Sequence, residues 1–317
     1  MREAFIAVDW GTSNFRAFLV DGQTGRCIAE KRSSAGLRAL DPEQFPHYCR
    51  QQLAEWRTGA GGSSPLPVYL AGMVGARTGW VEAPQLEMPL TLEALAENLM
   101  PAPGLDNAWL VPGAKMVTPS HVDVMRGEEV QAFGALSLAG RQGGLCCLPG
   151  THSKWVSARE NVLTHFTTLM TGELFHVLRF HTLVGEPIPR DEAFCAEGFE
   201  RGLTASRHPA GVLHALFEAR SRHLHQGLEA AQVGSFVSGV LIGSELDAMQ
   251  PQIEAQDSVV LVGSHELSAS YRRAMEMRGV AVCQVEADRA SIEGIRLLNR
   301  CRSGSPESSV PDGASSR

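Results

Sequence analysis

Two short turns in the sequence combine glycine with hydroxyl side chains and are therefore suited to binding phosphate. Each turn follows an apolar run and precedes a second run of alternating character. Turns of this composition expose backbone N–H groups and hydroxyls with little steric cover. Two of them, facing each other across a cleft, would hold a polyphosphate. The first turn contributes Gly11, Thr12, Ser13 and Asn14, and the second contributes Gly150, Thr151, Ser153 and Lys154.

A single acid, Asp9, stands directly before the first turn. A carboxylate there would organise Mg²⁺, through water because this ion gives up its hydration shell reluctantly. Leu148 holds the equivalent place before the second turn, so no second acid is offered there. Two simpler interpretations stay open at this point. The first turn is compatible with an ordinary polar hairpin, and Lys154 with a side chain that alternates outward along its strand.

Other nucleotide-binding and metal-binding motifs are absent from the sequence. No GxxxxGK[ST] loop occurs and no GxGxxG follows the first strand, which excludes the P-loop and the dinucleotide fingerprint. HExxH and EF-hand loops are absent as well. Four clustered histidines do not share one face of a predicted helix, so we interpret them as surface or core residues. They are His208, His214, His223 and His225.

The elements that flank the two turns predict a duplicated α/β unit. In the first half we expect the order βββαβαβ, with Asp41 as the N-cap of the first helix. The second half opens with three strand-like runs again, continues with inserted helices and ends as αβαβα, which suggests duplication with a period of about 140 residues. The expected strands cover 4–10, 15–21, 26–32, 66–73, 107–113, 143–150, 153–160, 161–170, 258–264 and 280–286. The expected helices cover 41–57, 91–99, 172–180, 190–204, 209–224, 234–249, 266–279 and 288–299.

Composition and charge exclude several classes of protein. The 317 residues carry a net charge of −7, which argues against a nucleic-acid partner because such proteins usually show a basic surface. No apolar run approaches the length of about 20 residues that spans a bilayer, and the first residues lack the pattern of a signal peptide. The seven cysteines include no CxxC pair and mostly lie in apolar runs, which favours a reducing cytoplasm.

The stretch AVDWGTSNFRAFLV resembles the first phosphate motif of the actin, hexokinase and Hsp70 superfamily. Together with AGMVGARTGWVEAP, DVMRGEE, LPGTHSKWV, FTTLMTGELF and SGVLIGSEL, it resembles the 2-dehydro-3-deoxygalactonokinase family over nearly the whole chain. The resemblance implies an α/β fold of two ribonuclease-H-like domains with a nucleotide cleft between them. We expect these domains at 1–116 and 117–302, followed by a disordered tail at 303–317.

The same resemblance implies a function. The family uses ATP and Mg²⁺ to phosphorylate the 6-hydroxyl of 2-dehydro-3-deoxy-D-galactonate, a step of galactonate and galactose breakdown. Its members carry the base for the attacking hydroxyl ahead of the second phosphate turn, where this sequence has Asp123, 27 residues before Gly150. We expect Ser120 to cap a helix whose first turn holds Asp123, although an acid there needs no catalytic role. Glu128 and Glu129 are the rivals.

An anionic sugar acid calls for an arginine that pairs with its carboxylate. Arg77 lies on a glycine-rich loop after a predicted strand, where ligands commonly sit in open α/β sheets, and Trp80 would wall the sugar. Arg16, beside the first turn, is a second candidate. Thr168, Thr171 and Glu173 would bind sugar hydroxyls, although Thr171 equally suits a helix cap.

The strand-to-helix junction at Gly263 and Ser264 resembles the part of the superfamily fold that cradles adenosine. Two rival functions stay open: a kinase for another sugar or sugar acid, and a non-catalytic ATP-binding regulator. A regulator would be expected to carry a DNA-reading head or a partner-binding domain, which this sequence lacks. The expected partner is a small sugar acid rather than a nucleic acid or a membrane, with a homodimer as an open possibility.

Overall fold

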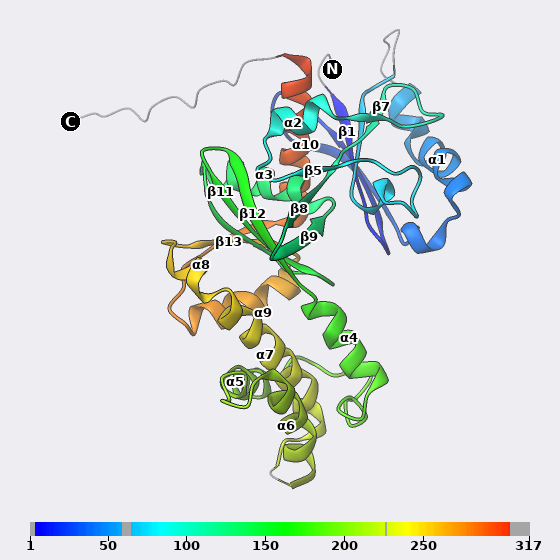
Figure 1. Cartoon of the computed structure of the whole chain (residues 1–317). Coiled ribbons are helices and arrows are strands. Elements are labelled where there is room, and N and C mark those ends of the chain that lie inside the picture. The colour runs from blue at the N-terminus through cyan, green and yellow to red at the C-terminus, as the bar shows by residue number, and fades with distance from the viewer. Residues whose placement is uncertain (1–3, 59–64, 226, 305–317) are drawn as a thin grey trace, which may run out of the picture.

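The computed structural model describes residues 4–58, 65–225 and 227–304. Two mixed sheets, with both parallel and antiparallel strand pairs, form the body of the molecule, and a group of helices extends from the second sheet (Figure 1). The sheets are built from the two halves of the chain in turn, so the α/β fold predicted from the sequence is confirmed.

The first sheet has the strand order β3-β2-β1-β4-β7-β6. Strand β1 pairs antiparallel with β2 and parallel with β4. It reads as a continuous apolar run because both of its faces are covered: Phe5 and Ala7 enter one core cluster, while Ile6 and Val8 enter another. The strands are β1 (Phe5–Trp10), β2 (Phe15–Val20), β3 (Cys27–Ser33), β4 (Val68–Ala71), β6 (Met100–Pro101) and β7 (Ala108–Leu110).

The second sheet has the order β12-β11-β10-β13-β14 and repeats the pairing of the first. Strand β10 pairs antiparallel with β11 and parallel with β13, as β1 does with β2 and β4. The predicted duplication is therefore confirmed at the level of topology. The strands are β10 (Gly144–Leu148), β11 (Ser153–Arg159), β12 (Val162–Leu169), β13 (Val259–Gly263) and β14 (Val282–Glu286).

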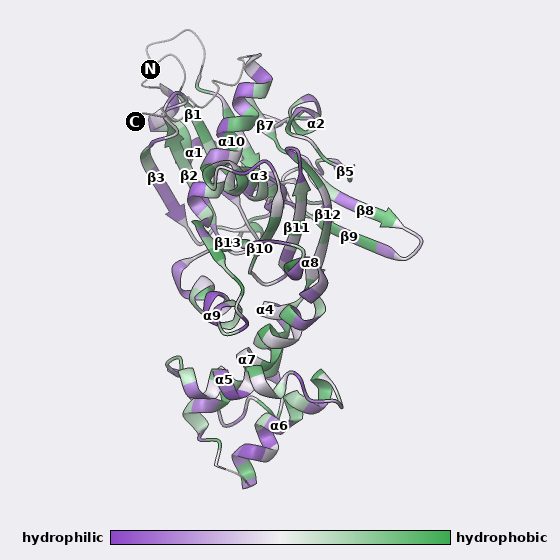
Figure 2. Cartoon of the chain, turned by 90° about the vertical axis from the view of Figure 1, so that its left-hand side faces the viewer, coloured by the Kyte–Doolittle hydropathy of each residue, from purple (hydrophilic) through white to green (hydrophobic). Residues whose placement is uncertain are grey.

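A small third sheet replaces one predicted helix. Strands β5 (Gln85–Glu87), β8 (Gly113–Thr118) and β9 (His121–Met125) form it, and β8 and β9 project as a hairpin (Figure 2). The predicted helix after Ser120 is therefore wrong, and Asp123 lies in the middle of β9 rather than in a first helical turn. The run from 121 to 125 alternates with period two, with two exposed valines, and Gly127 separates it from the helix that follows.

Two helices pack together between the sheets. Helix α3 (Glu128–Leu138) crosses α10 (Ala287–Ser303) so closely that a Cβ atom added to Gly134 would lie 1.9 Å from the carbonyl oxygen of Ala290. A Cβ atom added to Gly294 would lie 2.1 Å from the carbonyl oxygen of Val130. Glycine at these two positions brings the helix backbones into contact, which joins the two halves through one apolar cluster.

Each predicted outer helix is present in the structure with shifted ends, and the short helix α8 is an addition that the sequence did not predict. Helix α1 (Phe45–Thr58) follows a short turn of 3-10 helix whose capping box links Asp41 and Gln44, as predicted for Asp41. Helix α5 begins at Ala196, six residues later than residue 190 in the prediction. The remaining helices are α2 (Leu92–Glu97), α4 (Thr171–His181), α5 (Ala196–Ala205), α6 (Val212–His225), α7 (Ala230–Ala248), α8 (Gln250–Glu254) and α9 (His265–Glu276).

The predicted domain limits stay a prediction. The expected boundary after residue 116 falls inside β8, and Ser303, the first residue of the expected tail, is still the last residue of α10. Residues 305–317 of that tail lie outside the described residues.

No helix in the described ranges combines the length and the apolar character needed to cross a bilayer.

Candidate active site

The carboxyl end of β1, the end of β4 and the start of α3 meet at one point. A Cβ atom added to Gly127 would lie 3.0 Å from the Cα atom of Gly72, and one added to Gly72 would lie 3.4 Å from Oδ1 of Asp9. Both glycines have positive φ, a conformation that L side chains rarely adopt. The two acids that open α3, Glu128 and Glu129, are therefore brought towards the first turn.

Asp9 lies in a network of charges and hydrogen bonds beneath that turn. Arg16 donates to Oδ2 of Asp9 at 2.8 Å and to Asp288 on α10 at 2.8 Å. Gln131 and Ser291 lie at the 3.5 Å limit of hydrogen bonding to the same Asp9 oxygen. Burial raises the pKa of Asp9, Arg16 opposes that shift, and the Asp288 carboxylate adds to it. Arg16 thus bridges two carboxylates, and any role in substrate binding remains a prediction.

These residues fit Mg²⁺ held mainly through water and substrate phosphates. In the part of the chain that the structure describes, no group of three or more His, Cys, Asp or Glu side chains is arranged to hold a metal ion. The second oxygen of Asp9 makes no hydrogen bond to a described residue and faces the backbone of Gly72. Mg²⁺ commonly takes one or two carboxylates together with phosphates and several waters. A single free carboxylate oxygen suits that pattern.

The first turn keeps its polar side chains uncommitted. The N–H of Gly11 donates to the carbonyl of Asn14 at 2.9 Å, which closes the turn. Behind it, Gly36 approaches the backbone of Ser13 and Asn14 so closely that any Cβ atom there would clash at 2.4 Å. Among the described residues, no hydrogen bond uses the side chain of Thr12, Ser13 or Asn14. The turn is thus held by backbone contacts, with its side chains left available.

The second turn rests on the N-terminus of α4. A Cβ atom added to Gly172 would lie 2.3 Å from the carbonyl oxygen of Gly150, and the N–H of Glu173 donates to the carbonyl of Thr151 at 2.9 Å. The Glu173 carboxylate lies 2.6 Å from Nε2 of His152. Thr151 is exposed, and its side chain has no partner among the described residues. Glu173 is therefore placed beside the second turn, where the prediction of a sugar contact stays untested.

Lys154 is buried and does not alternate outward into solvent. Its side chain is 6% exposed, and its Nζ lies 3.9 Å from Oε1 of Glu128. Burial raises the pKa of Glu128, and the Lys154 ammonium partly offsets that shift. A buried ammonium with a single carboxylate at 3.9 Å keeps donors free for a further anion. The geometry is compatible with the predicted contact to phosphate.

Asp123, in β9 of the third sheet, contacts Thr168 at the end of β12 in the second sheet. Its carboxylate accepts hydrogen bonds from the N–H of Thr168 at 2.6 Å and from the Thr168 hydroxyl at 2.6 Å. Thr168 pairs with Lys154 in the register of β11 and β12, so the side chains of both residues share one face. Nε2 of His121 lies 3.8 Å from Asp123. The structure therefore places Asp123, Thr168, Lys154 and Glu128 in one neighbourhood, and the roles predicted for them stay predictions.

Glu129 is fully buried, and both of its oxygens accept the N–H of Gly127 at 2.8 Å. Burial, reinforced by the neighbouring Glu128 carboxylate, raises the pKa of Glu129 to about 8. The folded protein therefore keeps a proton that the unfolded chain loses near its ordinary pKa of 4.5. The contribution of Glu129 to the free energy of unfolding is therefore fully present below pH 4.5, and it is lost as the pH rises towards about 8.

We expect the raised pKa of Glu129 to appear as a difference in pH-dependent stability between wild type and Glu129→Gln. The free energy of unfolding of wild type, relative to the variant, should fall from about pH 5 to about pH 8, by at most about 1.4 kcal/mol per pH unit. Urea denaturation at a series of pH values measures it. Parallel curves for the two proteins would show that Glu129 is ionised throughout.

The loop after β4 places the two predicted sugar contacts differently. Arg77 is exposed, and its side chain has no partner among the described residues. Trp80 is 8% exposed and packs into the core of the first sheet. Its indole N–H is buried without a partner within the described part of the chain. Arg126 supports the same loop from beneath, donating to the carbonyl of Ala83 at 2.8 Å.

The predicted adenosine junction closes β13 and opens α9. Gly263 is the last residue of β13, and Ser264 is the N-cap of α9 without a side-chain cap bond. A Cβ atom added to Gly263 would lie 2.7 Å from Oγ of Ser268 and 3.9 Å from Pro149, beside the second turn. The Ser268 hydroxyl is buried and has no partner among the described residues. The junction thus adjoins the second turn, as a site for one nucleotide requires.

Two predicted contacts, Ser153 and Thr171, point into the protein instead. Ser153 is fully buried, and its hydroxyl lies 2.9 Å from the hydroxyl of Tyr271. The Thr171 hydroxyl donates to Glu245 on α7. Sequence reasoning missed both Glu245 and Asp288. The available signal for Glu245 was an acid that follows a run of small and apolar residues, from Val233 to Ser244, in the same helix.

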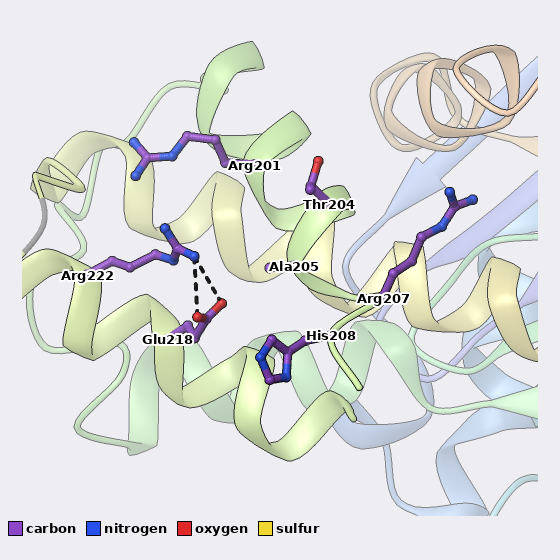
Figure 3. Close-up of a pocket in the computed structure, with 7 residues that line it drawn as sticks. All are labelled: Arg201, Thr204, Ala205, Arg207, His208, Glu218 and Arg222. Atoms are coloured by element: carbon purple, nitrogen blue, oxygen red, sulfur yellow. Dashed lines mark hydrogen bonds and ion pairs between the residues drawn. The ribbon is translucent and has the colours of Figure 1, made fainter. Parts of the chain in front are cut away.

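A separate cavity of about 340 Å³ lies between α5 and α6, away from this site (Figure 3). Its lining includes Arg201, His208 and Arg222, and Arg222 donates to Glu218 at 3.3 Å. None of the predicted site residues lines it. The candidate active site is therefore defined by the two turns and the start of α3.

Solved structures with little sequence identity share this two-sheet architecture. The fold is similar to that of the activator of 2-hydroxyisocaproyl-CoA dehydratase from Clostridium difficile, solved with bound ADPNP. The TM-score is 0.51 at 12% identity, with 95% of this chain and 96% of that chain covered. Component A of (R)-2-hydroxyglutaryl-CoA dehydratase from Acidaminococcus fermentans gives a TM-score of 0.54 at 11% identity, covering 96% of this chain and 99% of that one. Identities this low show the fold alone.

Sequence comparison is more specific. The model of the 2-keto-3-deoxy-galactonokinase family matches residues 9–298. The chain is 36% identical to 2-dehydro-3-deoxygalactonokinase of Escherichia coli K12 over 298 residues, which cover 94% of this chain and 98% of the relative. A crystal structure of a candidate 2-dehydro-3-deoxygalactonokinase from Sinorhizobium meliloti has a TM-score of 0.85 at 36% identity, covering 93% of this chain and 98% of that one. The chain therefore belongs to the 2-keto-3-deoxy-galactonokinase family.

Proposed function

We propose that this protein is a kinase that transfers the γ-phosphoryl group of ATP to the 6-hydroxyl of 2-dehydro-3-deoxy-D-galactonate, in galactonate catabolism. The observation that carries the proposal is the family match, which runs from residue 9 to residue 298. That span begins at Asp9 and includes both turns, the start of α3 and most of α10. The relative from Escherichia coli bears the name of this activity.

The two turns are assigned to the phosphates of ATP, and the β13–α9 junction to its adenosine. Phosphoryl transfer depends on alignment of the attacking oxygen and on neutralising the charge of the phosphates. The uncommitted hydroxyls of the first turn, the exposed Thr151 and the buried Lys154 ammonium support this assignment. Asp9 would hold Mg²⁺ through water, and the ion would neutralise phosphate charge when bound.

Asp123 is proposed as the base that takes the proton from the 6-hydroxyl. Support comes from its place beside Thr168 and Lys154, on the face of the second sheet that continues from the second turn. Both carboxylate oxygens already accept hydrogen bonds, which fixes their orientation. Glu128 is the rival, since burial raises its pKa, the Asp9 carboxylate adds to that shift, and the Glu128 carboxylate lies 3.9 Å from Lys154.

Arg77 is proposed to bind the carboxylate of the sugar acid. Its side chain is exposed and uncommitted within the described residues, so its removal should leave the fold intact. We expect Arg77→Gln to raise the KM for the sugar acid about 10-fold to 100-fold, the usual cost of losing a charge-assisted pair, with the KM for ATP unchanged. Arg159→Gln is the matched control, because the Arg159 side chain is 82% exposed and its one ion pair within the described residues is with Glu160. Equal KM values in both variants would remove Arg77 from the substrate site.

The proposal is tested by measuring ADP release with Mg-ATP and each of four acceptors. These are 2-dehydro-3-deoxy-D-galactonate, its gluconate-derived epimer, galactonate and glucose. We expect efficient turnover with the first. Preference for another acid would favour a different sugar-acid kinase of the same fold, and ATP binding without turnover would favour a regulator. We further propose action in the cytoplasm, on a small molecule rather than on a nucleic acid, with dimerisation to be decided by sedimentation.

A further inference from the structure

Glu245 is a buried acid at the centre of a network of hydrogen bonds that lies outside the two phosphate turns. It lies near the C-terminal end of α7, and its residue is 2% exposed. Around it α7 carries glycine, serine and aliphatic residues, so the carboxylate is enclosed by protein on all sides. Burial raises the pKa of Glu245, and the hydrogen bonds that it accepts oppose that shift. A buried acid is retained at such a cost only where its partners are arranged around it.

Three donors from three different elements converge on this carboxylate. The indole N–H of Trp155 in β11 donates to Oε1 at 2.8 Å. The hydroxyl of Tyr271 in α9 donates to Oε2 at 2.8 Å, and the hydroxyl of Thr171, the first residue of α4, donates to the same oxygen. An ionised carboxylate is an acceptor only, so this set of donors matches its ionised form.

The network continues to the second turn with a fixed direction. Tyr271 has one hydroxyl proton, which it gives to Glu245, so at 2.9 Å it accepts the proton of Ser153. Ser153 is the first residue of β11, directly after the turn. Its hydroxyl therefore stabilises the base of the turn rather than donating to phosphate, and the contacts to phosphate fall to Gly150, Thr151 and Lys154.

The elements that meet at Glu245 are the ones that frame both substrates. The second turn touches α4 through Gly150 and Gly172 and through the bond from Glu173 to Thr151. Helix α9 begins at the proposed adenosine junction. A shift at Glu245 would consequently move the turn, the start of α4 and the start of α9 together. Displacements of about 1 Å far from the reacting atoms lower catalytic rates by about 100-fold.

We propose that Glu245 is a positioning residue that holds the second phosphate turn and the start of α4 in register, so that ATP and the sugar acid are aligned. The inference rests on the proposed function for the identity of the two substrates. It assigns separate tasks to the branches of the network. The Tyr271 and Ser153 branch supports the second turn from β11, and the Thr171 branch supports the same turn from the start of α4.

Three near-isosteric variants test the branches separately. Glu245→Gln turns an acceptor oxygen into a donor, Tyr271→Phe removes the link to Ser153, and Thr171→Val removes the link to α4. We expect Glu245→Gln to weaken ATP binding and to raise the KM for the sugar acid, each by about tenfold, the usual scale for residues that orient ligands. Tyr271→Phe and Thr171→Val should each weaken ATP binding, because each removes one of the two supports of the second turn.

Glu192→Gln is the matched control. Glu192 is another buried acid of the helical region, and it contacts α7 at its opposite end by accepting the N–H of Gly234 at 2.9 Å. We expect this substitution to lower the melting temperature of the protein while leaving the affinity for ATP and the KM for the sugar acid unchanged. If Glu245→Gln behaves in the same way, Glu245 has a purely structural role and the proposal is wrong.

Two further outcomes are decided by the same set of proteins. If Glu245→Gln does not fold, Tyr271→Phe and Thr171→Val provide the test, because both keep the carboxylate. An unchanged ATP dissociation constant and an unchanged sugar-acid KM in both variants would overturn the proposal. ATP affinity is measured by calorimetry with Mg²⁺ and no sugar acid. Weakened ATP binding in Glu245→Gln would therefore support the positioning role even if wild type failed to phosphorylate the sugar acid, a result that would refute only the proposed function.

Discussion

The Asp9→Asn variant is expected to lose about 10²-fold to 10³-fold in kcat, the scale of removing one preorganised electrostatic contact to a transferring group. Asp9 directly precedes the first turn in the sequence, and one of its oxygens is free of hydrogen bonds to described residues. An amide keeps the shape of the side chain and its contact with Arg16 through its oxygen, but it removes the charge that organises Mg²⁺. Steady-state kinetics at saturating substrates measure the loss.

Folding should be preserved in this variant, which separates function from stability. Burial raises the pKa of Asp9, so the folded state does not favour its charge, and a neutral amide is not expected to lower the melting temperature. Asp257→Asn is the control, since Asp257 is an exposed acid outside the candidate site. A kcat for Asp9→Asn within a factor of about three of the control would exclude Asp9 as the metal-organising acid.

The second large effect is expected from Asp123→Ala. Removal of a general base lowers turnover by about 10²-fold or more, and ATP affinity should be nearly unchanged because we propose that Asp123 acts on the sugar acid rather than on ATP. The measurement is a single-turnover reaction with prebound ATP, which isolates the phosphoryl-transfer step. Undiminished turnover would show that Asp123 is not the general base, and Glu128→Gln would then be the next variant to test.

Thr168→Val separates catalysis by Asp123 from a role in fixing the hairpin. Thr168 donates through both its N–H and its hydroxyl to Asp123, which ties β9 to β12. The valine variant loses the hydroxyl bond and keeps the carboxylate. If Asp123 is the base, Thr168→Val should lose far less activity than Asp123→Ala. Equal losses in the two variants would indicate that the bond between the strands is what matters.

The sequence was informative where local pattern and local chemistry agree. Strand β1 was predictable because its apolar run ends in an acid and a glycine-containing turn, and the same arrangement without the acid recurs at β10. Asp41 was predictable as a cap because an N-cap and its partner lie three residues apart. Both are short-range features, which a single sequence records directly.

The misplaced helix shows where local pattern misleads. The run from 121 to 125 alternates between partly buried and exposed positions, yet its exposed positions are valines rather than polar residues. An acid close to a serine, followed by two glutamates and a helix, resembled a capped helical start. The hairpin is determined by pairing with β8 and by the bonds from Asp123 to Thr168, 45 residues away, which local propensity does not record.

The central contacts of the site were out of reach for the same reason. Arg16 and Asp288 are 272 residues apart, and Tyr271 and Ser153 are separated by 118. Trp80, predicted as a wall for the sugar, was recognisable as an aromatic residue on a glycine-rich loop, but its burial depends on packing against the first sheet. Residue type and spacing thus predicted the class of site, whereas tertiary packing decides which side chains face it.

The most direct test of the central claim is to follow phosphorus by NMR in a reaction of purified protein with equimolar Mg-ATP and 2-dehydro-3-deoxy-D-galactonate. We predict a new phosphomonoester signal, coupled to the two protons on C6 of the sugar acid, that grows in step with ADP. ADP accompanied only by inorganic phosphate, or ATP that stays intact, would contradict the assignment of this chain as a kinase for that hydroxyl.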